Sequence, residues 1–194
     1  MNDPVTLEFD GGSRGNPGPA GIGVVLRAAD GTSLLTLGRF IGRATNNVAE
    51  YSALIAGLEL AAGMGIRRLR VRGDSELIIR QMQGSYRVKH PDLRPLYERA
   101  SDLVGQFDQV EFEHGRRHKN RLADRLANLA MDRRTEITEI DENESAEPET
   151  SPAPKAGDHY ACPRCGCSIE VRTPSRLYPH QLRPFICQCG AKMG

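Results

Sequence analysis

The segment of residues 135–158 limits what this chain can fold into more than any other feature. It carries eight Asp and Glu residues against one Lys, and three of its residues are prolines. Because it has almost no large apolar side chain after Ile140, it cannot bury a core, and we expect a disordered acidic linker. The 194-residue chain then divides into a first domain, residues 1–134, and a C-terminal module, residues 159–194.

Charge differs between these three parts, although the formal net charge of the chain is only +1. The first domain has 20 Lys and Arg against 16 Asp and Glu, for +4; the linker has −7, and the C-terminal module has five against one, for +4. Two basic parts joined by an acidic spacer can approach a polyanion such as nucleic acid, but the charge alone does not require one.

The sequence contains no signal for a membrane or for export. No apolar run approaches the roughly 18 residues that a bilayer-spanning helix needs. The N-terminus, MNDPVTLEFD, lacks the basic start and apolar core of a secretory signal. We therefore predict a cytoplasmic protein with no membrane partner.

Hydrophobic periodicity in the first domain predicts alternating strands and helices. Val5, Leu7 and Phe9 alternate with polar residues, which is typical of a strand with one buried face. Asn47 stands where it could cap a helix. The expected strands cover residues 5–10, 23–28, 33–40, 68–72 and 110–114, and the expected helices cover 47–63, 75–83, 92–107 and 121–134. This order predicts an α/β fold, a mixed sheet with helices on its faces.

Four carboxylates stand at the junctions of these elements. Asp10 ends the first strand and Asp74 ends the fourth, whereas Glu50 and Asp124 lie near the starts of helices. Each could have a purely structural role: Glu50 could complete a capping box with Asn47, and the aspartates could serve turns or helix N-termini.

The blocks around these carboxylates are FDGGSRGNPGPAGIG, ATNNVAEYSAL, RGDSELIIRQM and HGRRHKNRLADRLANLA. In this order and spacing, they resemble the ribonuclease H type I family over essentially all of residues 1–134. The resemblance implies a ribonuclease H-like five-stranded mixed sheet with flanking helices. It also implies an endoribonuclease that hydrolyses the RNA strand of RNA–DNA hybrids and leaves 5′-phosphate and 3′-hydroxyl ends.

The resemblance further implies that Asp10, Glu50, Asp74 and Asp124 converge on one catalytic site. Four like charges in a cleft repel one another unless cations or protons neutralise them. Oxygen ligands without Cys or His select hard cations such as Mg²⁺ or Mn²⁺, and two such ions can clamp the attacking and leaving oxygens of a phosphodiester. In the family, Asp10 would bridge two ions, with Glu50 and Asp74 on one side and Asp124 on the other.

Substrate-binding candidates follow from the need to distinguish RNA from DNA by the 2′-hydroxyl. Gly11 and Gly12 allow close approach to a sugar-phosphate backbone, and three asparagine amides can reach sugars or groove edges. The full set of candidates is Gly11, Gly12, Asn16, Asn46, Asn47 and, more weakly, Gln81. For Asn47, a helix cap is an equal alternative.

The basic segment of residues 114–121 leads into the last helix of the first domain. His114 matches a histidine that some family members use in proton transfer or product release, and Arg117 matches an arginine that others use. The alternative is a solvated basic loop. The family's Trp- and Lys-rich handle is absent between Asp74 and Asp124, so the chain is similar to the handle-less variety.

All five cysteines lie in the C-terminal module, which resembles a small zinc ribbon. Cys162 and Cys165 would form one knuckle and Cys187 and Cys189 the other, since four thiolates give a tetrahedral Zn²⁺ site and a segment this small needs such a staple. Because the second pair is Cys-x-Cys, three residues are alternative ligands: Cys167, His159 and His180. The module's basic and aromatic residues would suit either a nucleic-acid or a protein partner.

Two other functions remain open at this stage. The first domain could be a non-catalytic nucleic-acid adaptor, but a binder has no need for clustered like charges. It could also be a nuclease of the same superfamily that acts on another nucleic acid, which the Asn- and Gly-rich segments disfavour.

Overall fold

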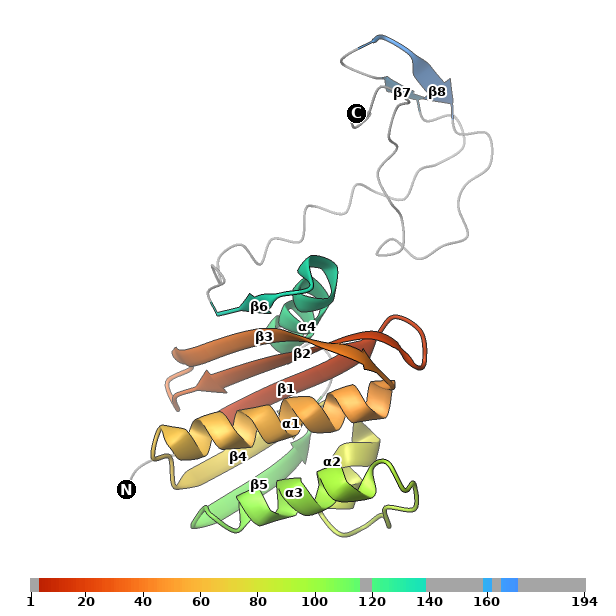
Figure 1. Ribbon diagram of the computed structural model, residues 1–194. Coiled ribbons are helices and arrows are strands. Elements are labelled where there is room, and N and C mark those ends of the chain that lie inside the picture. Colours follow the sequence, from red (N-terminus) through yellow and green to blue (C-terminus); the bar gives the residue numbers. More distant parts are fainter. Residues whose placement is uncertain (1–3, 116–119, 139–158, 162–164, 171–194) are drawn as a thin grey trace. The chain divides into compact units, whose positions relative to one another are not determined.

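The computed structural model describes residues 4–115, 120–138, 159–161 and 165–170. The chain divides into two units, Met1–Ile140 and Asp141–Gly194. In the first unit the elements follow in the predicted order, and a short strand, β6, comes last (Figure 1). Their bounds are β1 Val5–Ser13, β2 Gly18–Arg27, β3 Ser33–Ala44, α1 Asn46–Gly63, β4 Arg68–Gly73, α2 Glu76–Met82, α3 Arg94–Val104, β5 Gln109–His114, α4 Arg121–Arg133 and β6 Glu136–Ile137. In the second unit, β7 (His159–Ala161) pairs antiparallel with β8 (Ser168–Glu170).

One mixed sheet forms the centre of the first unit, with the strand order β5-β4-β1-β2-β3-β6. Antiparallel pairing joins β1 to β2, β2 to β3 and β3 to β6, whereas β4 pairs parallel with both β1 and β5. The mixed α/β architecture is confirmed. The expectation of five strands is corrected to six, because β6 adds a short antiparallel partner to β3.

The sixth strand lies inside the segment predicted to be a linker. Ile137 is only 7% exposed and packs with Leu126 of α4, and Arg39 donates to Glu136 at 2.6 Å. The first unit therefore continues past Arg134 through at least Thr138. One apolar residue does not stand out in the composition of an acidic segment, yet Ile137 packs in a buried cluster with Val25 of β2 and Leu126 of α4. The rest of the predicted linker, residues 139–158, lies outside the described residues.

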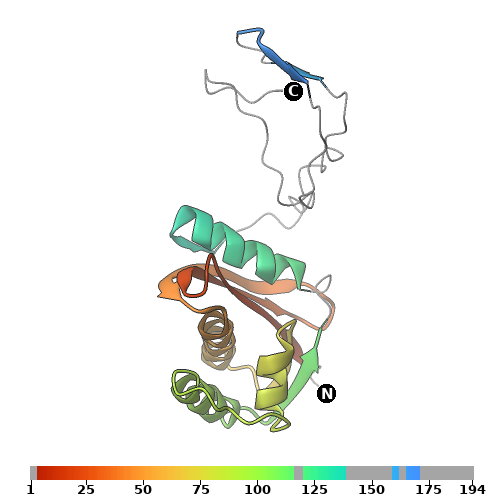
Figure 2. The same cartoon turned by 90° about the vertical axis from the view of Figure 1, so that its right-hand side faces the viewer.

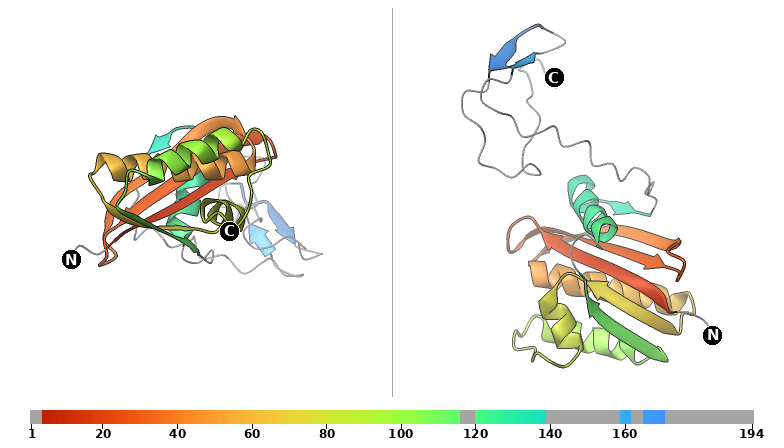
Figure 3. Two further views of the ribbon diagram at one scale, coloured as in Figure 1. Left: turned by 90° about the horizontal axis from the view of Figure 1, so that it is seen from below. Right: turned by 180° about the vertical axis from the view of Figure 1, so that it is seen from behind.

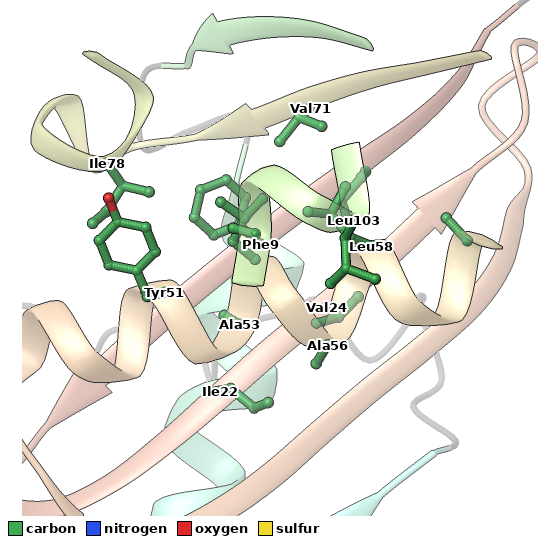
Figure 4. Close-up of a cluster of buried hydrophobic side chains, with 14 of the residues drawn as sticks. Phe9, Ile22, Val24, Tyr51, Ala53, Ala56, Leu58, Val71, Ile78 and Leu103 are labelled. Carbon is green, nitrogen blue, oxygen red and sulfur yellow. The ribbon is translucent and has the colours of Figure 1, made fainter. Parts of the chain in front are cut away.

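Helices cover both faces of the sheet (Figure 2). The larger core lies between the sheet and α1, α2 and α3, and Phe9, Tyr51, Leu58, Val71 and Ile78 are among its buried side chains (Figure 4). On the opposite face, α4 packs against β1, β2 and β3. No helix in the described part of the chain is long and apolar enough to span a bilayer.

Several element ends differ from the predictions, for local reasons. Helix α1 is capped by Thr45, whose Oγ1 accepts from the Val48 backbone N–H at 3.3 Å, so Asn47 is not the cap and forms no capping box with Glu50. Strand β1 continues past Asp10 because Gly11 and Gly12 still pair with β2. Helix α3 spans only Arg94–Val104 rather than residues 92–107.

Candidate active site

Asp10 and Asp74 are brought side by side by the pairing of two parallel strands. Glu8 of β1 lies opposite Arg72 of β4, so the side chains two residues further along each strand emerge at the same end of the sheet. Asp10 is 8% exposed, and Asp74 is half-buried just after the end of β4. The carboxyl ends of two parallel strands thus form the floor of the site.

Glu50 joins these aspartates because Gly11 allows α1 to touch β1. A Cβ atom on Gly11 would lie 2.2 Å from both the Ala49 carbonyl carbon and the Glu50 backbone nitrogen, distances that no side chain tolerates. Only glycine lets the N-terminal half of the helix approach the strand this closely. Ligand oxygens of Asp10, Glu50 and Asp74 consequently lie within 4.8 Å of one another.

Electrostatics make this carboxylate group a candidate cation site. The pKa of Glu50 is raised to about 9, chiefly by burial and then by the nearby charges of Asp10 and Asp74, while a hydrogen bond from the Gly11 backbone acts in the opposite direction. Glu50 Oε2 is buried and has no hydrogen-bond partner among the described residues. Three crowded oxygen donors, one of them buried and unpaired, fit a hard divalent cation such as Mg²⁺.

Asp124 lies on α4, on the opposite face of the sheet from α1 (Figure 3). The helix packs closely on the sheet because glycines lie beneath it: a Cβ on Gly23 would be 1.9 Å from the Ala123 carbonyl oxygen. Asp124 is exposed, and its carboxylate accepts from Asn128 Nδ2 at 3.1 Å. It is not a member of the three-carboxylate group, so the structure brings together three of the four predicted carboxylates.

The predicted substrate-binding asparagines gather at the start of α1, beside Glu50. Asn16, Asn46 and Asn47 are all exposed, and Asn16 Oδ1 accepts from the Asn46 backbone N–H at 3.1 Å. This bond ties the β1–β2 turn to the helix N-terminus. Gly12, in contrast, lies under α4, where a Cβ would be 3.5 Å from the Met131 methyl carbon.

Gln81 does not fit the role of a substrate-binding residue. It is 4% exposed, and its Oε1 accepts from the Tyr51 hydroxyl at 2.7 Å. This prediction is corrected: the amide joins α2 to α1 inside the core, because helical periodicity turns position 81 toward Tyr51 rather than toward solvent.

His114 ends β5 next to β4 and is exposed. Its Nε2 donates to the backbone carbonyl oxygen of Asp74 at 3.1 Å, which brings the ring to the edge of the carboxylate group. Arg117, the other candidate in this basic segment, lies outside the described residues. The catalytic role of either residue stays a prediction.

In the second unit, Cys165 and Cys167 have their Sγ atoms 3.4 Å apart and come just before β8 in the chain. His159 begins β7. Four of the predicted or alternative zinc ligands, Cys162, His180, Cys187 and Cys189, lie outside the described residues. The ligand set stays a prediction.

Two buried polar residues near the site were not singled out from the sequence. Asn120 is 1% exposed, and its Nδ2 donates to the Phe9 carbonyl oxygen at 2.8 Å. Glu8 is 6% exposed and pairs with Arg27 at 3.3 Å and with Arg72 at 3.6 Å. The position of Asn120, four residues before Asp124, was the only available signal, since burial of a polar residue cannot be read from composition.

Comparison with known protein families finds relatives of the first unit. A family model described as reverse transcriptase-like matches residues 8–130, which include all four predicted carboxylates. A bifunctional protein of Mycobacterium tuberculosis is 53% identical over 129 residues, 66% of this chain and 35% of the relative. A ribonuclease HI of Halobacterium salinarum is 50% identical over 128 residues, covering 66% of this chain and 64% of the relative. The chain thus spans only about a third of the mycobacterial relative.

Other comparisons cover nearly all of the matching protein. A ribonuclease H of Syntrophotalea carbinolica is 33% identical over 142 residues, 66% of this chain and 90% of the relative. The N-terminal RNase H domain of a Mycobacterium tuberculosis protein superposes with a TM-score of 0.65 at 53% identity, covering 67% of this chain and 100% of that one. LC11-RNase H1, solved in complex with an RNA/DNA hybrid, gives 0.65 at 44% identity, covering 67% and 98%. The family model and these matches show that the chain belongs to the ribonuclease H family.

Proposed function

We propose that this protein is an endoribonuclease that hydrolyses the RNA strand of RNA–DNA hybrids. The observation that carries the proposal is the group formed by Asp10, Glu50 and Asp74, whose ligand oxygens lie within 4.8 Å of one another in a ribonuclease H-family domain. A relative at 44% identity was solved with an RNA/DNA hybrid, which supports the same substrate here. A non-catalytic adaptor is disfavoured, because clustered and partly buried like charges destabilise a fold unless protons or cations neutralise them, and a binding module has no need for such a cluster.

Two Mg²⁺ or Mn²⁺ ions would be held by Asp10, Glu50, Asp74 and Asp124. When bound, such ions activate a water molecule and stabilise the charge that develops on the scissile phosphate, which leaves 5′-phosphate and 3′-hydroxyl ends. The support for this assignment is the buried, unpaired Glu50 Oε2 and the absence of nitrogen or sulfur ligands from the group.

The remaining residues of the site would bind and orient the hybrid. Asn16, Asn46 and Asn47 present exposed amides next to Glu50, where they would contact 2′-hydroxyls and groove edges of the RNA strand. Gly11 and Gly12 would admit the backbone, although each also serves helix packing. His114, held at the Asp74 carbonyl, would move a proton or assist product release, and Arg117 would share that task.

We also propose a domain organisation for the chain, including a zinc-binding C-terminal module. A catalytic domain would be joined by the acidic linker to a module that binds one Zn²⁺ through Cys162, Cys165, Cys187 and Cys189. The 3.4 Å separation between the sulfurs of Cys165 and Cys167 supports the alternative in which Cys167 replaces one ligand. The module would contact nucleic acid or a protein partner, and the protein would act in the cytoplasm.

A cleavage assay tests the catalytic proposal. The full-length protein should cleave the RNA strand of a labelled hybrid with Mg²⁺, but not duplex DNA, and excess chelator should stop the reaction. Asp10→Asn should abolish turnover while hybrid binding remains. Asp102→Asn makes the same chemical change at an exposed position of α3 and should cleave like wild type. Robust cleavage by Asp10→Asn, or by wild type in chelator, would contradict the metal-ion assignment.

A further inference from the structure

Asn120 has an unusual hydrogen-bond arrangement for a residue that begins a helix. An Asn at the N-cap normally accepts a hydrogen bond from the second or third backbone N–H of its helix, which is worth about 1 kcal/mol. Asn120 occupies the N-cap of α4 without making this bond. Its Nδ2 instead donates to the Phe9 carbonyl oxygen at 2.8 Å, across 111 positions of the sequence. The side chain therefore serves the contact between α4 and β1 rather than the helix itself.

Burying the Asn120 side chain costs free energy, so the stability of α4 does not explain why an amide occupies this position. Asn120 is 1% exposed, and its Oδ1 is buried without a partner among the described residues. A buried acceptor left without a donor costs about 1–3 kcal/mol. An apolar residue of similar size would avoid this cost. The amide is better explained by the hydrogen bond that its Nδ2 donates to the Phe9 carbonyl oxygen.

Two consecutive hydrogen bonds connect the backbones of two predicted metal ligands through Asn120. Its side chain binds the carbonyl of Phe9, the residue directly before Asp10. Its own carbonyl accepts from the Asp124 backbone N–H at 3.0 Å, the first helical bond of α4. Any shift of Asn120 along β1 would move Asp124 relative to Asp10.

Packing alone does not fix this position. Gly23, under Ala123, sets how closely α4 lies on the sheet, because the would-be Cβ contact of 1.9 Å is with helix backbone. A steric contact of this kind limits how closely α4 can approach the sheet. A directional hydrogen bond also limits movement of the helix along the β1 strand. Asp124 is exposed and lies outside the three-carboxylate group, so its reach toward the other ligands depends on where α4 begins.

We propose that Asn120 is a positioning residue that sets the distance between Asp124 and the Asp10 group by anchoring the start of α4 to β1. The inference rests on the proposed metal-ion function of Asp124. It assigns Asn120 no contact with substrate. Its prediction is that loss of the Asn120 donor slows the chemical step and weakens the response to metal without weakening hybrid binding.

The test compares Asn120→Ala and Asn120→Asp with wild type in the full-length protein at pH 8. Asn120→Asp keeps the side-chain size but removes the donor. Both should lower the single-turnover rate about tenfold to a hundredfold, because small displacements of a catalytic group have effects of this size. Both should also raise the Mg²⁺ concentration for half-maximal rate, with hybrid affinity unchanged.

Ile137→Ala is the control for destabilisation of α4, since Ile137 packs in the buried cluster that contains Ala123 and Leu126 of the same helix. It should lower the melting temperature without changing the Mg²⁺ response. Wild-type rates in Asn120→Asp, or equal changes in the Mg²⁺ response of Asn120→Ala and Ile137→Ala, would overturn the proposal. Failure of the proposed function is a different result, namely wild-type cleavage by Asp124→Asn.

Discussion

Glu50 is a protonated acid at neutral pH in the metal-free protein, because burial and the charges of Asp10 and Asp74 raise its pKa to about 9. The unfolded chain would release this proton near its ordinary value of 4.5. Between these two pH values, the folded state binds more protons than the unfolded state. In the metal-free protein, the contribution of Glu50 to the free energy of unfolding is therefore largest at low pH. This contribution is lost as the pH rises toward 9.

We expect the free energy of unfolding, measured by urea titration in chelator, to fall between pH 5 and 9 with a Glu50 contribution of up to about 1.4 kcal/mol per pH unit. Glu50→Gln should remove most of this fall, whereas Glu98→Gln, at an exposed position of α3, should not. Mg²⁺ must displace the Glu50 proton, so metal affinity should rise with pH over the same range. Parallel pH curves for wild type and Glu50→Gln would show that Glu50 is not the titrating group.

Gly11 is the residue that allows Glu50 to reach Asp10. Gly11→Ala would force its methyl into the backbone of Ala49 and Glu50, and α1 would have to move away from β1. We expect a loss of about 1–3 kcal/mol in stability and a larger fractional loss in cleavage rate than in hybrid affinity. Gly63→Ala, at the last residue of α1, meets nothing within 4 Å and should be neutral or stabilising by up to about 1 kcal/mol. Chemical denaturation and single-turnover cleavage of both variants decide the matter.

At the scale of elements, the site depends on how helices approach a sheet. Helix α1 delivers Glu50 from one face over Gly11, and α4 delivers Asp124 from the other face over Gly23. Strand β6 stabilises the position of α4, because Ile137 packs in the buried cluster that also contains Leu126 of this helix. This two-residue strand extends the catalytic domain into a segment whose composition predicted a linker.

We expect Ile137→Ala to cost about 2 kcal/mol or more of stability, in the range measured for large-to-small changes of buried aliphatic residues. Glu136→Ala changes the neighbouring residue of the same strand but removes only its largely exposed ion pair with Arg39, which is worth about 0–1 kcal/mol. Urea denaturation of the two variants measures the difference. Equal small losses would mean that β6 does not stabilise the domain.

At the scale of the whole molecule, the second unit carries a charge of +4 in residues 159–194 and an acidic segment precedes it. If the zinc module grips nucleic acid, a flexible tether gives it a high effective concentration near a hybrid held by the first unit. Maximal cleavage rate would then be independent of the module, while binding would depend on it.

A chain ending at Ile140 should therefore cleave with a similar maximal rate but bind hybrid more weakly, and its binding should depend less steeply on salt, because fewer phosphates are neutralised. Salt titrations of both chains measure the two slopes. Elemental analysis should find one Zn²⁺ in the full-length protein and none in the shortened chain. Equal slopes would indicate a protein partner, and absence of zinc would contradict the ribbon.

Periodicity and motif predicted the order of the elements and the position of the four candidate carboxylates at strand and helix ends. Asp10 and Asp74 follow alternating apolar strands, and Glu50 follows a cap signal that lay two residues earlier than expected, at Thr45 rather than Asn47. Gln81 was misassigned because its residue type suggested an amide for substrate, whereas helix α2 turns it into the core beside Tyr51.

Local sequence therefore determined which residues could form strands, helices and a carboxylate site, because periodicity, glycine and motif spacing act over a few residues. Tertiary structure decided which of these groups meet. The 4.8 Å group of Asp10, Glu50 and Asp74 depends on parallel register and on a helix touching a glycine about 40 positions earlier, and the Asn120–Phe9 bond spans 111 positions. Contacts at such separations arise only when strands pair and helices dock, since burial and hydrogen bonding are properties of the folded chain and not of its local sequence.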